Sequence, residues 1–97
     1  MKNKSTAKER FHMSKVASLG CIVCRMAGLE SAPEIHHIGN GAMGKRASNY
    51  EVIPLCHIHH RTGGHGVAVH AGRKTWEANF GTEKELLKLT LELVNDL

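Results

Sequence analysis

The sequence predicts a small α+β domain that is held together in part by a metal site. Two short segments rich in apolar residues, 33–38 and 50–55, predict a pair of strands joined by a glycine-rich loop. Leucines at helical spacing in 82–97 predict a C-terminal helix. The chain of 97 residues has three cysteines, an odd number that suits a metal site in a reducing compartment better than a disulfide framework.

The N-terminal third is expected to contain a tail, one helix and a loop. Residues 1–10 are polar and basic, and we expect them to be flexible. Residues 11–19 predict a short helix that stops at Gly20, and 21–32 predict a loop that carries a Cys-x-x-Cys motif. The chain therefore divides into a flexible basic N-terminus and a single folded domain, 11–97.

The middle of the chain predicts a hairpin followed by a helix. The segment PEIHHI (33–38) predicts one strand and YEVIPL (50–55) the other, with the glycine-rich loop 39–49 between them. The next segment, CHIHHRT (56–62), predicts a helix of about two turns that is closed by two glycines.

Two helices are expected in the C-terminal third, after a connection that carries further histidines. Residues 73–81 predict a short helix that ends at Gly81. Thr82 and Glu85 form a T-x-x-E capping box, which predicts the start of the last helix. The apolar stripe of that helix predicts that one face packs on the core.

The cysteines are spaced as zinc ligands. Cys21 and Cys24 can occupy two corners of a tetrahedral site, whereas a redox pair would require a βαβ context and would leave Cys56 unexplained. Cys56 and His59 share a helix face at i and i+3. These four residues predict a structural Cys₃His zinc site, with His60 as the alternative fourth ligand.

A second group of histidines faces the predicted hairpin. If His59 binds zinc, His60 points about 100° away around the same helix and is free to face the strands. The first strand carries His36 and His37, whose side chains point to opposite faces because they are neighbours on a strand. Two strands, a loop and a helix would then form a ββα hairpin with a ligand on each side.

This pattern resembles a known nuclease family. The segments EIHHI and IPLCHIHHR, with Asn49 between them, resemble the motif of HNH endonucleases, whose fold is the ββα-metal or His-Me finger. The resemblance covers about residues 21–65. The segment HHRTGGHGVAVHAGRKTWEANFGT (59–82) further resembles the phage recombination-enhancement nucleases that need RecA filaments.

The resemblance implies a role for each motif residue. His37 would be the general base, and Asn49 would hold it in orientation. His36 and His60 would bind a catalytic divalent cation such as Mg²⁺, Mn²⁺ or Zn²⁺. Position 36 is His where the family often has Asp, which makes the site softer, and position 59 is His where the zinc knuckle usually has Cys.

Other polar residues near the motif are candidates for supporting roles. His65 and His70 are candidate additional metal ligands or phosphate contacts, whereas His57 and His12 are expected on the surface. A basic rim that could contact phosphates is predicted at Lys45, Arg46, Arg61, Arg73 and Lys74.

We therefore expect a metal-dependent HNH-type DNA endonuclease, phage-derived and acting with a RecA-type recombinase filament. The alternative is a non-catalytic, zinc-stabilised module that binds nucleic acid or protein, which would need neither His37 nor His60. A redox or metal-storage protein fits the composition but not the ordered spacing. The net charge of +4 is compatible with DNA without identifying it. We expect the cytoplasm of a bacterial or phage-infected cell, because the sequence contains no membrane-length apolar run and no signal peptide.

Overall fold

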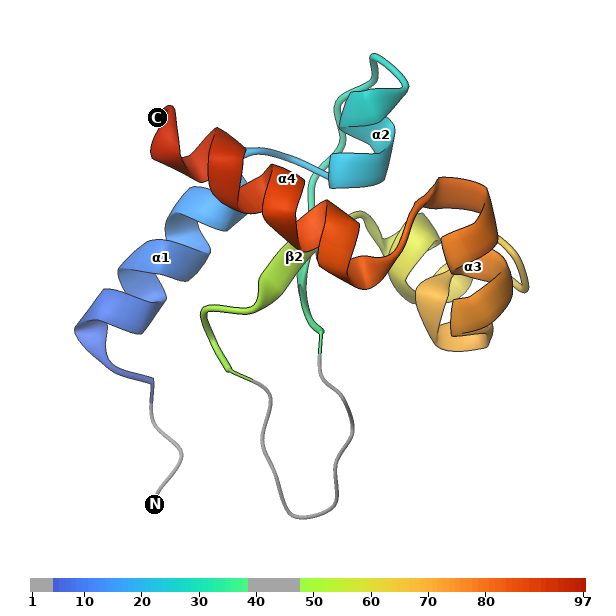
Figure 1. Cartoon of the computed structure of the whole chain (residues 1–97), viewed down its shortest axis with the longest axis horizontal. Coiled ribbons are helices and arrows are strands. Elements are labelled where there is room, and N and C mark those ends of the chain that lie inside the picture. The colour runs from blue at the N-terminus through green and yellow to red at the C-terminus, as the bar shows by residue number, and fades with distance from the viewer. Residues whose placement is uncertain (1–4, 39–47) are drawn as a thin grey trace.

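The computed structural model describes residues 5–38 and 48–97. The start of the predicted tail (1–4) and the loop residues 39–47, with the rim residues Lys45 and Arg46, lie outside this range. The described chain is a small α+β fold with a two-stranded sheet and helices on either side of it in sequence (Figure 1). Its elements are α1 (Ala7–Ser18), α2 (Ile22–Met26), β1 (Glu34–His37), β2 (Val52–Leu55), η1 (Ile58–Thr62), η2 (Val69–Ala71), α3 (Arg73–Phe80) and α4 (Glu83–Asn95).

The sheet is the antiparallel pair that the sequence predicts. Glu34 of β1 lies opposite Leu55 of β2, and His37 lies opposite Val52. All of β2 is buried, whereas β1 ends in a buried His36 followed by an exposed His37. This difference arises because β2 also contacts α1, α2 and α4, which cover it.

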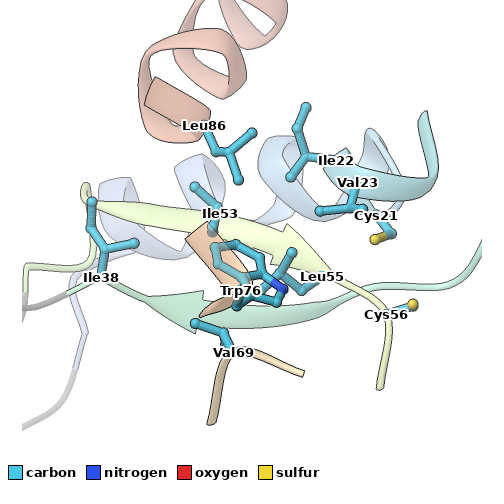
Figure 2. Close-up of a cluster of buried hydrophobic side chains, with 10 residues drawn as sticks. All are labelled: Cys21, Ile22, Val23, Ile38, Ile53, Leu55, Cys56, Val69, Trp76 and Leu86. Carbon is cyan, nitrogen blue, oxygen red and sulfur yellow. The ribbon is translucent and has the colours of Figure 1, made fainter. Parts of the chain in front are cut away.

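The core forms where α2, α3 and α4 meet β2 (Figure 2). Trp76 of α3 is fully buried and belongs to the same cluster as Ile53 and Leu55 of β2 and Leu86 of α4. A second cluster joins α1 and α4 through Val16, Leu19, Val52 and Val94. Both clusters include residues of β2, so the strand that leads into the zinc-ligand segment is held from two sides.

The N-terminal helix begins earlier than the sequence predicts. Thr6 caps α1 and forms a capping box with Glu9, so residues 7–10 are helical and the expectation of a flexible tail is wrong for them. Gly20 follows the end of α1 with φ of 74°, a left-handed conformation that favours glycine. The expected loop after it contains the short helix α2, with Cys21 as its N-cap.

The C-terminal helices follow the predictions closely. α3 ends before Gly81, and α4 begins with the capping box of Thr82 and Glu85.

The helix expected over 56–62 is shorter than predicted and forms the single π-helical turn η1. Among the described helices, none is both long and apolar enough to cross a bilayer.

Candidate metal centre and catalytic site

The four predicted zinc ligands meet in one cluster. The Sγ atoms of Cys24 and Cys56 are 3.9 Å apart. Nδ1 of His59 lies 3.6 Å from Sγ of Cys21, 3.7 Å from Sγ of Cys24 and 3.2 Å from Sγ of Cys56. In a tetrahedral zinc site, bond lengths predict about 3.8 Å between two sulfurs and about 3.6 Å between sulfur and nitrogen. The cluster can therefore hold a metal such as zinc, and His59 rather than His60 is its fourth member.

Local structure explains why these side chains converge. As the N-cap of α2, Cys21 accepts a hydrogen bond at its Sγ from the backbone N–H of Cys24, 3.4 Å away. Cys56 directly follows β2, and the turn of η1 brings His59 back toward it. The Phe80 ring packs edge-on against the His59 ring, with ring centres 5.2 Å apart. The cluster thus joins α2, the end of the sheet and η1.

Zinc binds thiolates and neutral imidazoles, so the protonation of these ligands matters. Burial raises the pKa of Cys21 to about 11, which keeps the metal-free thiol protonated at neutral pH. Burial also opposes ionisation of Cys56, but hydrogen bonds from the His59 backbone and from the Cys21 and Cys24 side chains lower the pKa of Cys56 overall. Burial lowers the pKa of His59 and favours its neutral ring. Metal binding must therefore release protons from this cluster.

A second cluster brings together His36, His60 and His70, whose ligand atoms all lie within 4.8 Å of one another. Nε2 of His60 is 3.0 Å from Nε2 of His70, and the His36 ring centre is 5.1 Å from each of the other two. Two nitrogens that bind one octahedral metal at about 2.1 Å lie about 3.0 Å apart. Burial, with His36 and His60 nearby, lowers the pKa of His70 and favours its neutral ring. This set has the donors and the spacing to hold one divalent metal.

Two acidic residues support this histidine cluster, and neither has a role predicted from the sequence. Oε2 of Glu83 lies 2.7 Å from Nε2 of His36, and Oε1 of Glu34 lies 2.8 Å from Nδ1 of His60. Arg61 also donates to Glu34, with Nε 2.9 Å from Oε1. The hydrogen bond from the Arg61 guanidinium, and to a lesser extent the one from His60, lowers the pKa of Glu34 to about 2. Glu34 could have been found, because it shares a strand face with His36, whereas no local pattern marks Glu83.

The residues proposed as base and orienting group are also in contact. Nε2 of His37 donates a hydrogen bond to Oδ1 of Asn49 over 2.7 Å. His37 is exposed, whereas its neighbour His36 is 6% exposed. The strand therefore divides the adjacent histidines as predicted, with the buried His36 directed into the histidine cluster and His37 toward solvent.

The remaining histidines lie outside both clusters. Nδ1 of His65 donates to the carbonyl of Ala71 at 3.2 Å, so this candidate ligand is not brought to the metal sites within the described chain. His57 is exposed, as expected, and bonds the Thr62 hydroxyl at 2.8 Å. His12 is half-buried rather than on the surface, and burial followed by the charge of Lys15 lowers its pKa.

In the described part of the basic rim, two of the cations lie next to acidic side chains. Arg61 is paired with Glu34, and Nη1 of Arg73 lies 3.8 Å from Oε1 of Glu83. Lys74 is exposed at the start of α3. The two arginines therefore support the acids behind the histidine cluster, and Lys74 is the better candidate for a phosphate contact.

Comparison with known proteins places the chain in a family. No curated protein matches it. A family model described as recombination enhancement, RecA-dependent nuclease matches residues 5–95 and so covers both clusters and all of the helices and strands. The chain therefore belongs to the recombination-enhancement, RecA-dependent nuclease family.

Proposed function

We propose that the chain is a metal-dependent DNA endonuclease of the HNH type, which hydrolyses phosphodiester bonds in concert with a RecA-type filament. The observation that carries this proposal is the His37–Asn49 hydrogen bond on the strand that also supplies His36 to the histidine cluster. A base and a cluster of metal-binding donors on one rigid hairpin are what phosphodiester hydrolysis requires. The family description supports the nuclease activity and the link to RecA.

His37 acts as the general base in this mechanism. Oδ1 of Asn49 accepts a hydrogen bond from Nε2–H of His37, so the neutral ring keeps its lone pair on Nδ1. That nitrogen takes a proton from the water that attacks the phosphorus. Histidine suits this role because it can accept and return a proton near neutral pH.

His36, His60 and His70 would hold the catalytic cation. When bound, this cation would stabilise negative charge on the scissile phosphate and on the leaving oxygen. Three imidazoles favour Mn²⁺ or Zn²⁺ over Mg²⁺, which prefers oxygen ligands. His70 adds to the pair predicted from the motif and would give the cation a third protein ligand.

The cysteine cluster has a structural role. Four protein ligands would fill the coordination of a zinc ion, which is typical of structural zinc sites. His59 of that cluster directly precedes His60, so zinc at the cysteines fixes the backbone that presents His60 to the catalytic centre. The strand pair followed by a helical turn with these ligands supports a ββα-metal finger.

Cleavage assays with a variant of the base test the proposal. Zinc-loaded protein is incubated with single-stranded and duplex DNA, with Mn²⁺ or Mg²⁺, in the presence and absence of RecA filaments. His37→Ala should reduce the cleavage rate by about 10²- to 10⁴-fold, the usual share of a general base. Zinc content and Mn²⁺ affinity should stay at the parental values, because His37 belongs to neither cluster.

His57→Ala is the matched control, because it removes an exposed histidine outside both clusters. This variant should cleave like the parent. Equal cleavage by His37→Ala and the parent would refute the assignment of the base. A folded, zinc-loaded parent that binds DNA but cleaves none of these substrates would instead identify a zinc-stabilised binding module.

A further inference from the structure

A buried acid from the last helix reaches the histidine cluster. Glu83 is the first residue of α4 and is 8% exposed, and its Oε2 lies 2.7 Å from Nε2 of the equally buried His36. The two residues are 47 positions apart in the sequence. Buried carboxylates are rare unless they are paired, so the contact with His36 accounts for the position of Glu83.

The backbone at Glu83 is held in place by contacts at the start of α4, and its carboxylate has a cation nearby. Its backbone N–H donates to Oε2 of Glu77 at 2.8 Å, and the capping box of Thr82 fixes the start of α4. Nη1 of Arg73 lies 3.8 Å from Oε1, the oxygen that does not contact His36. The positive end of the helix dipole also attracts a carboxylate in the first turn. Glu83 is therefore a preorganised acceptor.

This acceptor determines which nitrogen of His36 carries the proton. A carboxylate only accepts hydrogen bonds, so Nε2 of His36 is the protonated nitrogen and the lone pair of the neutral ring is on Nδ1. His60 is arranged in the same way with the nitrogens exchanged. Its Nδ1 faces Glu34, and its Nε2 lies 3.0 Å from Nε2 of His70. Each of these two histidines thus has one nitrogen on an acid and one left for a metal.

We propose that Glu83 is a positioning residue for the catalytic metal centre, and that it makes α4 part of that centre. The proposal rests on the metal role of His36 in the proposed function. Carboxylates behind metal-binding histidines fix the tautomer and orientation of the ring and make it a better ligand. The centre then extends beyond the strand pair and η1, and the start of the C-terminal helix completes it.

The tautomer of His36 is the first test. Long-range ¹H–¹⁵N NMR on the parent that carries one zinc per chain, at the cysteine cluster, and no further metal should show His36 protonated on Nε2. Glu83→Ala should lose this preference and give a mixture of the two tautomers. A parent His36 that is protonated on Nδ1, or that exchanges between both forms, would overturn the proposal without any need for a folded variant.

Metal affinity is the second test. Mn²⁺ binding to the zinc-loaded full chain, followed by EPR, should weaken about 10- to 100-fold in Glu83→Ala, the usual effect of losing such a partner. Glu83→Gln keeps an acceptor oxygen and should recover most of the affinity. Glu92→Ala removes an exposed acid from the same helix and should bind like the parent. Thermal unfolding and zinc content, measured for each variant, test whether the variants fold like the parent.

The outcomes separate this inference from the function on which it rests. Equal Mn²⁺ affinity in the parent and in Glu83→Ala would overturn the positioning role and leave the nuclease proposal standing. A parent that binds no Mn²⁺ at His36, His60 and His70 would overturn the proposed function itself.

Discussion

Nε2 of His37 lies 2.7 Å from Oδ1 of Asn49, a contact that joins the end of β1 to the turn that precedes β2. His37 is exposed, so packing alone does not hold its ring. The hydrogen bond supplies that restraint and leaves Nδ1 available as an acceptor. The exposed His37 ring thus has a defined orientation because of one hydrogen bond to the Asn49 amide.

The first prediction concerns this amide. Asn49→Ala should lower the cleavage rate by about 10- to 100-fold, because the base remains but its orientation is lost. The loss should be smaller than that of His37→Ala. Asn49→Asp keeps an acceptor oxygen and should retain more activity than Asn49→Ala. Single-turnover cleavage measures the effect, and a rate for Asn49→Ala equal to that of the parent would show that the contact has no catalytic role.

His70 gives the second prediction. His70→Ala should raise the Kd for Mn²⁺ by more than about tenfold, because losing a direct ligand should cost at least as much as losing an outer partner. His65→Ala is the matched control, since His65 lies five positions earlier and bonds a backbone carbonyl instead. Calorimetric titration of zinc-loaded protein compares the two variants. Similar affinities for both would exclude His70 as a ligand.

The spacing of the cysteines and histidines along the chain explains why much of the site could be predicted from the sequence. The two-residue gap between Cys21 and Cys24 lets both thiolates reach adjacent corners of one site, and Cys56 and His59 are separated by one helical turn. That turn is π-helical rather than α-helical, yet it still brings His59 to the cysteines. The alternation of side chains on a strand likewise predicted the separation of His36 and His37.

Contacts that depend on tertiary packing were not predictable in this way. Glu83 meets His36 only because α4 packs on β2 and begins beside the cluster, and one sequence carries no signal for that placement. The early start of α1 is different. Thr6 and Glu9 form the same T-x-x-E capping box that predicts the start of α4. The start of α1 was therefore predictable from the sequence, despite the charged residues around it.

The third prediction concerns the cysteine cluster. Purified protein should retain one zinc there, and Cys24→Ser should lose it together with the cooperative thermal transition. Structural zinc binding is worth about 10–16 kcal/mol in small domains, which is comparable to the whole stability of a typical protein. Met26→Ser, an exposed change in the same helix, should retain both zinc and stability. Elemental analysis and circular dichroism report the outcome, and stable zinc-free protein after chelation would contradict it.

The last prediction separates two cations that look alike in the sequence. Lys74 is exposed and Arg61 is paired with Glu34, so of these two described cations Lys74 is the one available to neutralise a phosphate. Lys74→Ala should reduce the salt slope of single-stranded DNA binding by about 0.7, and that of duplex binding by about 0.9. Lys88→Ala removes one exposed positive charge from α4 and controls for net charge.

Arg61→Ala should leave the salt slope near the parental value and act on the metal instead. Glu34 would lose the partner that holds it against His60, so the Kd for Mn²⁺ should rise while the number of released counterions stays the same. DNA affinity measured between about 50 and 200 mM salt provides the slope. A drop in slope for Arg61→Ala as large as that for Lys74→Ala, with unchanged Mn²⁺ affinity, would mean that Arg61 leaves Glu34 to bind DNA.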